Sequence, residues 1–153
     1  MIDNRRKIIG VIGGSECSEE IYNLAFQVGK LLARRNFTLI CGGFGGVMEA
    51  AAKGAKSENG LTIGIIPSND PEDANPYIDI PVVTGMGIGR NILIVRSSDA
   101  LIAIDGKYGT LSEIAYACQL QKKIIGLNTW DIPDVTPAEN AEDAVNKVTE
   151  FFR

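Results

Sequence analysis

The feature that most constrains the fold of this chain is a repeated pattern in which an apolar run ends in glycine and a helical pattern follows. The apolar runs lack strict alternation of apolar and polar residues, which is typical of parallel strands buried on both faces. Strands that alternate with helices predict an α/β fold, doubly wound and Rossmann-like, with a mainly parallel sheet and helices on both faces. The expected strands cover residues 7–13, 37–41, 61–66, 82–83, 99–104 and 124–127, and the expected helices cover 18–35, 47–56, 90–97, 110–121 and 136 to the C-terminus.

The length of the chain, 153 residues, predicts one domain over residues 1–153. The polar, proline-bearing segment 68–81 is expected to form a surface loop. Residues 92–95 are apolar all round, so the helix that contains them is expected to be buried on more than one side. The last helix is expected to begin at Thr136, with Pro137 in its first turn and Glu139 near its start.

Glycine-rich turns follow the expected strands at residues 13–15, 42–46, 85–89 and 106–109. For any single turn, the alternative is a tight connection in which glycine only supplies a positive φ. Several such turns at one sheet edge favour a phosphate-bearing ligand held by backbone N–H groups. None of the turns matches G-x-G-x-x-G or the P-loop pattern, which argues against dinucleotide dehydrogenases and P-loop NTPases. The candidate phosphate- or nucleotide-binding residues are Gly13, Gly14, Ser15, Gly42, Gly43, Gly45, Gly46, Gly106, Lys107, Tyr108, Gly109 and Thr110.

Charge and composition exclude several classes of function. The formal net charge is −4, and no basic run exceeds residues 5–7, so we expect no nucleic-acid binding. No apolar run reaches the ~20 residues of a membrane span and no signal-peptide core is visible, so we expect a cytoplasmic protein without membrane contact. The chain has no histidine, and its 3 cysteines are widely spaced. We therefore expect no metal site, and any catalysis must rest on carboxylates, Arg, Lys, Tyr or a hydroxyl group.

Thr110 and Glu113 have the spacing of a capping box, in which both side chains bond to backbone N–H groups at a helix start. The same place could hold a phosphate and a catalytic carboxylate, so a structural and a chemical role are both open for Glu113. Arg90 stands at an expected helix start, where the helix dipole disfavours a cation. That placement favours recruitment for an anion or a carboxylate over a solvated surface arginine. Asp105 and Lys107 are either site residues or plain turn residues.

Several motifs together resemble the Lonely Guy superfamily over nearly the whole chain. They are "GGFGGVMEAAAKGA" at 42–55, "GIIP" at 64–67, "GRN" at 89–91, "SSDALIAIDGKYGTLSEI" at 97–114 and "GLNTW" at 126–130. Members of this superfamily include cytokinin riboside monophosphate phosphoribohydrolases, proteins once described as possible lysine decarboxylases, and molybdenum cofactor carrier proteins. The segment 74–91 looks closer to the carrier-like branch than to the hydrolases, and lysine decarboxylase activity is not expected.

The resemblance also carries residue roles. In the hydrolases the signature reads P-G-G-x-G-T-x-x-E, and Gly106, Gly109, Thr110 and Glu113 match it. Asp105 and Lys107 replace the proline and the second glycine of the signature. Arg90 matches an arginine that the family places upstream, so the resemblance implies Glu113 and Arg90 as the catalytic pair.

As a carrier, the protein would bind a phosphorylated nucleotide-like ligand, either a nucleotide or a molybdopterin-type cofactor as cargo, without a required cofactor of its own. As an enzyme, it would hydrolyse the N-glycosidic bond of a nucleoside 5′-monophosphate. For that role we expect an ionised Glu113, because an adjacent arginine and a helix N-terminus favour the charged form. The resemblance and the apolar helix at 92–95 also imply a homo-oligomer, either a dimer or a tetramer.

Overall fold

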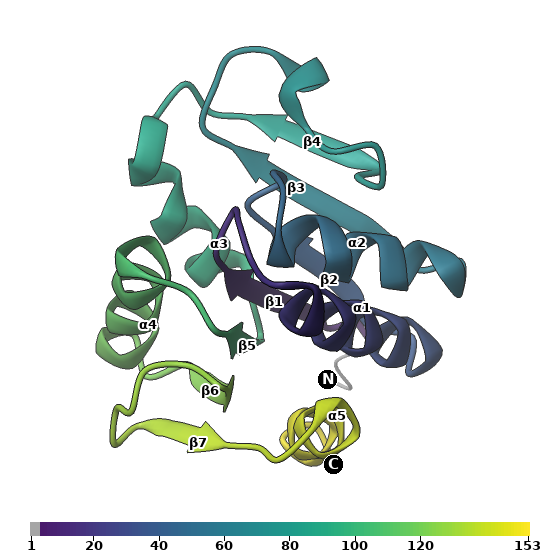
Figure 1. Ribbon diagram of the computed structural model, residues 1–153, viewed down its shortest axis with the longest axis vertical. Helices are drawn as coiled ribbons and strands as arrows, with labels where there is room; N and C mark the ends of the chain where they lie inside the picture. Colours follow the sequence, from purple (N-terminus) through teal and green to yellow (C-terminus); the bar gives the residue numbers. More distant parts are fainter. Residues whose placement is uncertain (1–3) are drawn as a thin grey trace.

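The computed structural model describes residues 4–153, so residues 1–3 of the expected domain lie outside the described part and the extent 1–153 stays a prediction. Its centre is a 7-stranded sheet in the order β4-β3-β2-β1-β5-β6-β7, with parallel pairing throughout the described residues (Figure 1). The strands are β1 (Ile8–Gly13), β2 (Thr38–Cys41), β3 (Thr62–Ile66), β4 (Ile80–Val83), β5 (Ala100–Ile104), β6 (Lys123–Leu127) and β7 (Val135–Pro137). The helices are α1 (Glu19–Arg34), α2 (Val47–Ser57), α3 (Asn91–Ser97), α4 (Tyr108–Gln119) and α5 (Ala141–Glu150), with short 3-10 turns η1 (Pro71–Asp73) and η2 (Gly87–Arg90).

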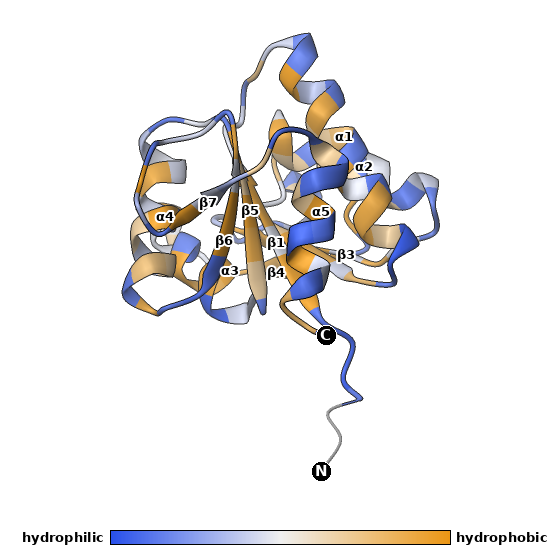
Figure 2. Ribbon diagram, turned by 90° about the horizontal axis from the view of Figure 1, so that it is seen from below, coloured by the Kyte–Doolittle hydropathy of each residue, from blue (hydrophilic) through white to orange (hydrophobic). Residues whose placement is uncertain are grey.

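Helices cover both faces of the sheet, with α1, α2 and α5 on one face and α3 and α4 on the other (Figure 2). Successive side chains of a strand point to opposite faces. Ile9 and Val11 of β1 therefore pack with α1, α2 and α5, whereas Ile12 packs with α3 and α4. Because helices cover both faces of the sheet, the central strands carry apolar side chains on both faces. The predicted doubly wound, parallel α/β fold is confirmed.

The strand order reverses direction at β1, which pairs with β2 on one side and with β5 on the other. In doubly wound sheets, the carboxyl ends of the strands at such a switch point diverge into a crevice that binds ligands. Here the turn after β1 begins at Gly13, and the turn after β5 contains Gly106. The fold thus brings together glycine turns that lie about 90 residues apart in the sequence.

The prediction for the last helix is wrong at its start. Residues 135–137 form β7, in which Thr136 pairs with Ile125 of β6. The helix α5 begins later, at Ala141, and is capped by Asn140, whose Oδ1 accepts a hydrogen bond from the backbone N–H of Asp143 at 2.8 Å. A strand pairing with the sheet edge and a better cap downstream together outcompete the local signal at Thr136.

The segment predicted as a loop at 68–81 also holds some regular structure. It contains η1, which is capped by the side chain of Asp70, and it includes the first residues of β4, which begins at Ile80. Pro81 is tolerated in β4 because that strand lies at the edge of the sheet.

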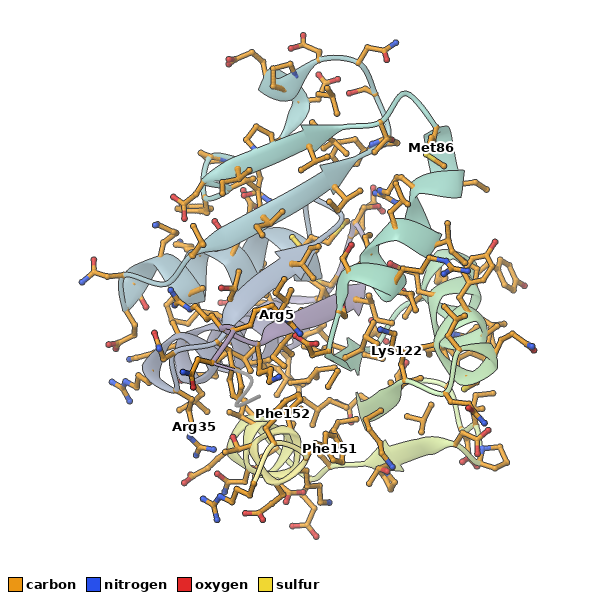
Figure 3. All side chains as sticks on the ribbon, turned by 180° about the vertical axis from the view of Figure 1, so that it is seen from behind. Arg5, Arg35, Met86, Lys122, Phe151 and Phe152 are labelled. Atoms are coloured by element: carbon orange, nitrogen blue, oxygen red, sulfur yellow. The ribbon has the colours of Figure 1, made fainter. Side chains whose placement is uncertain are left out.

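The apolar helix α3 is buried only in part. Ile94 and Val95 are fully buried against the sheet, whereas Ile92 and Leu93 remain partly exposed. Beyond α3, the edge strand β4 and the turn after it carry exposed apolar side chains, and Figure 3 shows Met86 near the end of β4. The exposed apolar residues of β4 and of this turn, here called the β4 patch, are Ile80, Val82, Val83, Met86 and Ile88. Within β4, the side chain of Val83 points to the other face of the sheet from those of Ile80 and Val82. None of the helices within residues 4–153 is long and apolar enough to cross a membrane.

Candidate functional site

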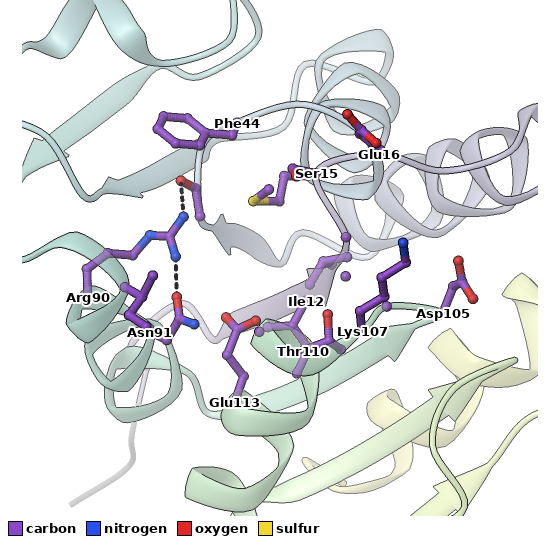
Figure 4. A pocket seen from close by; sticks show the side chains of 18 of the residues that line it. Ile12, Ser15, Glu16, Phe44, Arg90, Asn91, Asp105, Lys107, Thr110 and Glu113 are labelled. Atoms are coloured by element: carbon purple, nitrogen blue, oxygen red, sulfur yellow. Dashed lines mark hydrogen bonds between the residues drawn. The ribbon is translucent and has the colours of Figure 1, made fainter.

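A cavity of about 390 Å³ opens at the carboxyl ends of the central strands, between the glycine turns and the start of α4 (Figure 4). Many of the predicted site residues line it: Gly13, Gly14, Ser15, Gly42, Arg90, Gly106, Lys107, Gly109, Thr110 and Glu113. The structure does not place Gly43, Gly45, Gly46 or Tyr108 on the cavity wall. Gly46, with φ of 61°, is instead the N-cap of α2, and the Tyr108 side chain is 81% exposed. The cavity coincides with the switch point that the sheet order defines.

The turn between β5 and α4 presents free backbone donors to this cavity. Asp105 and Gly106 have φ values of 50° and 93°, a left-handed conformation that turns the chain sharply into α4. Within residues 4–153, none of the backbone N–H groups of residues 106–110 donates a hydrogen bond to the protein. Consecutive free N–H groups at a helix start form a concave donor site that favours an anion.

The geometry excludes the capping-box role for Thr110 and Glu113. Helix α4 begins at Tyr108, and its N-cap is Lys107, which makes no side-chain cap hydrogen bond. Thr110 therefore lies within the first turn and Glu113 lies in the second. Both side chains are more than nine-tenths buried, with exposed fractions of 2% and 6%, and neither has a hydrogen-bond partner within residues 4–153. Among the described residues, no side-chain polar atom is both buried and without a partner. The oxygen atoms of Thr110 and Glu113 are therefore accessible from the cavity that they face in Figure 4, where a ligand could bind them.

The expectation of an ionised Glu113 is wrong for the unliganded protein. Burial raises the pKa of its carboxyl group from 4.5 to about 8, and the opposing effect of the Arg90 charge is smaller. The helix dipole acts mainly within the first turn, which Glu113 lies beyond. Arg90 and Glu113 also form no ion pair within the described residues. At neutral pH the carboxyl group is therefore mostly protonated and can donate a hydrogen bond into the cavity.

Arg90 is held by backbone carbonyl groups at the base of the cavity. Its Nε donates to the carbonyl oxygen of Ile65 at 2.9 Å, and its Nη2 donates to that of Gly42 at 3.3 Å. Its Nη1 donates to Oδ1 of Asn91, and its guanidinium lies 5.8 Å from the centre of the Phe44 ring. Burial lowers the pKa of Arg90, but a guanidinium stays charged in proteins. The cavity floor thus carries a fixed positive charge.

One wall of the cavity is apolar, formed by Phe44, Met48, Pro67 and Ile88, and Phe44 stands next to Arg90. Ile88 is 86% exposed and stands on the rim. A cavity with an apolar wall and a few convergent polar groups is typical of a site for a small molecule. These apolar residues were missed from the sequence, although each stands in or just after a glycine turn or a strand end, where a search for apolar neighbours would have found them.

Acidic residues do not gather into a metal site here. Among the residues that the structure describes, no group of at least 3 His, Cys, Asp or Glu side chains is placed to hold a metal ion. Glu16, Asp105 and Lys107 line the cavity as further charged groups. The donors around the cavity include backbone N–H groups, a hydroxyl group, a protonated carboxyl group and the Lys107 ammonium group, a set suited to oxygen-rich ligands.

Sheet order, cavity and free donors together define a doubly wound α/β protein with a small-molecule site at its switch point. The chain belongs to the SLOG cluster4 family, whose family model matches residues 6–151. The resemblance to the Lonely Guy superfamily, and to its carrier-like branch, is confirmed by this match and by the following similarities.

The chain is similar in structure to the molybdenum cofactor binding protein of the phototrophic bacterium Rippkaea orientalis, with a TM-score of 0.94, 36% identity and coverage of 99% of this chain and 100% of that one. It is also similar to the molybdenum cofactor carrier protein of Chlamydomonas reinhardtii, with a TM-score of 0.86, 32% identity and coverage of 97% and 99%. In sequence, it is 32% identical over 120 residues to the cytokinin riboside 5′-monophosphate phosphoribohydrolase of Mycobacterium tuberculosis. That match covers 72% of this chain and 64% of the enzyme, so the chain spans less than two thirds of the enzyme's length.

Proposed function

We propose that this protein binds a phosphorylated, nucleotide-like ligand and holds it without turnover, as a carrier. The observation that carries this proposal is the set of free backbone N–H groups at residues 106, 107, 109 and 110, which line a cavity together with the Thr110 hydroxyl group. The phosphate of the ligand would accept hydrogen bonds from these donors. The fixed charge of Arg90 on the cavity floor adds a favourable field for an anion.

The rest of the ligand would lie across the cavity towards its apolar wall. Phe44 and Ile88 would contact a planar ring, and the protonated carboxyl group of Glu113 would donate a hydrogen bond to an oxygen or nitrogen atom of the ligand. A nucleotide, or a molybdopterin-type cofactor as cargo, has both the phosphate group and the planar ring that such a site would bind. Such a cargo would be held through its phosphate and its ring, because the described residues offer no set of metal ligands. The similarity to proteins that bind or carry the molybdenum cofactor supports this assignment.

Hydrolysis of a nucleoside 5′-monophosphate is the second candidate function, and the position of Glu113 in the cavity favours it. In that reaction, the C–N bond between sugar and base breaks, and water adds its oxygen to the anomeric carbon. The products are the free base and ribose 5-phosphate. A protonated Glu113 would donate its proton to the departing base, a form of help that is typically worth about 10²- to 10⁴-fold. The resulting carboxylate would then accept the proton that the attacking water loses, which restores Glu113. The similarity to a phosphoribohydrolase supports this alternative.

AMP distinguishes the two functions. We expect AMP to bind in isothermal titration calorimetry and to be recovered intact by chromatography after prolonged incubation, because Asp105 and Lys107 replace the proline and the second glycine of the hydrolase signature. Mass spectrometry of small molecules that co-purify with the protein would identify the natural cargo. Free adenine that forms with the wild type and not with the folded Glu113→Gln variant would establish the hydrolase instead. A protein that binds neither AMP nor inorganic phosphate nor any co-purifying phosphorylated molecule would refute both.

We also propose that the chain self-associates through the β4 patch, because exposed apolar patches of this kind mark protein interfaces. Light scattering should give at least twice the chain mass of 16.4 kDa. Val82→Lys should lower that mass by placing a charge in the patch. Gln27→Lys is the control. It adds the same charge on the exposed side of α1, outside the β4 patch, and should leave the mass unchanged. A monomeric wild type would contradict the proposal.

A further inference from the structure

The turn that presents the candidate phosphate site is held from outside the cavity by the segment that follows β6. Thr129 Oγ1 donates a hydrogen bond to the carbonyl oxygen of Asp105 at 2.8 Å. Trp130 Nε1 donates to the carbonyl oxygen of Lys107 at 3.1 Å. Neither Thr129 nor Trp130 lines the cavity of about 390 Å³. Both therefore act on the turn from the side away from the ligand.

The planarity of the peptide bond converts these contacts into an orientation of the donors. In a trans peptide unit, the carbonyl group and the following N–H group point in opposite directions. No cis peptide bond occurs in the described residues. Because Thr129 holds the Asp105 carbonyl group towards itself, the N–H group of Gly106 must point away from Thr129. Gly106 lines the cavity and Thr129 does not, which favours an N–H direction into the cavity.

The turn needs such a restraint because its conformation is unusual. Asp105, a residue with a side chain, has a φ of 50°, and Gly106 follows with a φ of 93°. Non-glycine residues in this region are strained and persist only where surrounding contacts fix them. Thr129 lies beside Gly126, where an added Cβ atom would lie only 2.8 Å from its Cγ2 methyl group. The absence of a side chain at Gly126 leaves the room that Thr129 occupies.

We propose that Thr129 is a positioning residue for the phosphate cradle, because its hydroxyl group aims the Gly106 N–H group into the cavity. The proposal rests on the function proposed above. Trp130 has a weaker role of the same kind, because the Lys107 carbonyl group also accepts the first hydrogen bond of α4, from the N–H group of Leu111 at 2.9 Å. The helix already orients the Lys107 carbonyl group. Among the described residues, the Asp105 carbonyl group accepts a hydrogen bond only from Thr129.

The test compares Thr129→Val, which keeps the shape and loses the hydroxyl group, with Thr129→Ser, which keeps the hydroxyl group. Calorimetric titration with AMP and with inorganic phosphate should show affinity about tenfold weaker in Thr129→Val, the value of one lost charge-assisted hydrogen bond, and restored to within about twofold in Thr129→Ser. Trp130→Phe should weaken binding by less than Thr129→Val. In amide spectra of the unliganded protein, the Gly106 resonance should move in Thr129→Val and stay near its wild-type position in Thr129→Ser.

Equal affinities of Thr129→Val and the wild type would overturn the proposal. Equally weak binding by Thr129→Val and Thr129→Ser would overturn it too, because loss of packing alone would then explain the effect. A wild type that binds neither AMP nor phosphate would refute the proposed function. In that case the amide spectra still decide the positioning role, which is wrong if the Gly106 resonance stays in place in Thr129→Val.

Discussion

Glu113→Gln is expected to stabilise the folded protein by an amount that grows with pH, from almost nothing near pH 4 to at most about 5 kcal/mol above pH 8. The pKa of the buried Glu113 carboxyl group is raised from 4.5 to about 8. Each unit of such a shift corresponds to about 1.36 kcal/mol of differential interaction between the two protonation states. Glutamine is close in shape and never ionises, so the variant escapes the cost of a buried charge.

The direction follows from proton binding. Between pH 4.5 and about 8, the native state retains the Glu113 proton that the unfolded state has lost. The free energy of unfolding of the wild type therefore falls across this window because of this group, and levels off above it. Below pH 4.5 both states are protonated and the wild type and the variant should have similar stability. A capping glutamate would behave differently, because glutamine also serves in a capping box and the substitution would be nearly neutral at every pH.

Urea unfolding of the wild type and the variant at pH 5, 6, 7 and 8 measures this difference directly. Comparing the two proteins at each pH cancels the titration of groups that they share. Glu142→Gln, an exposed glutamate on α5, serves as the matched control and should show a small difference that does not change with pH. A Glu113→Gln difference that is flat with pH would mean that Glu113 is ionised in the folded protein, as the sequence led us to expect.

The fold was predictable because its signals are local. Apolar runs that end in glycine and lead into helices recur along the chain, and a parallel sheet places all their carboxyl ends at one edge. That geometry alone brings Gly13, Gly42 and Gly106 to one cavity. The start of α5 was mispredicted because Thr136 has a good local cap signal, while the competing strand pairing with Ile125 depends on a distant segment.

The chemical state of the site was less predictable, because it depends on burial. The spacing of Thr110 and Glu113 suggests a cap, yet α4 begins at Tyr108 and leaves both side chains facing the cavity. The sequence suggests Arg90 as a partner for Glu113, yet two of its nitrogen atoms donate to backbone carbonyl groups that only the folded sheet brings near, and a third donates to Asn91. Composition and spacing thus identify which residues meet, and tertiary structure decides which of them are charged.

Gly109→Ala is expected to weaken binding of AMP and of inorganic phosphate by at least about tenfold, with no loss of stability. Gly109 lines the cavity within the first turn of α4, and a Cβ atom built on it would meet no protein atom within 4 Å. The added methyl group would therefore cost nothing sterically in the unliganded protein. It would instead occupy space next to the free N–H groups of residues 106–110, where the phosphate oxygens are proposed to lie.

In this variant, the affinity for AMP and phosphate should therefore fall while the stability of the folded protein does not. Alanine favours a helix by up to about 1 kcal/mol over glycine, so the melting temperature should stay constant or rise. Gly89→Ala provides the control, because Gly89 lies outside the cavity wall and an added Cβ atom there would meet its nearest neighbours at an ordinary 3.9 Å. That variant should bind AMP as the wild type does. If Gly109→Ala also binds AMP and phosphate with wild-type affinity, the phosphate does not sit at the start of α4, because no phosphate oxygen could reach those N–H groups past the methyl group without some loss of contact.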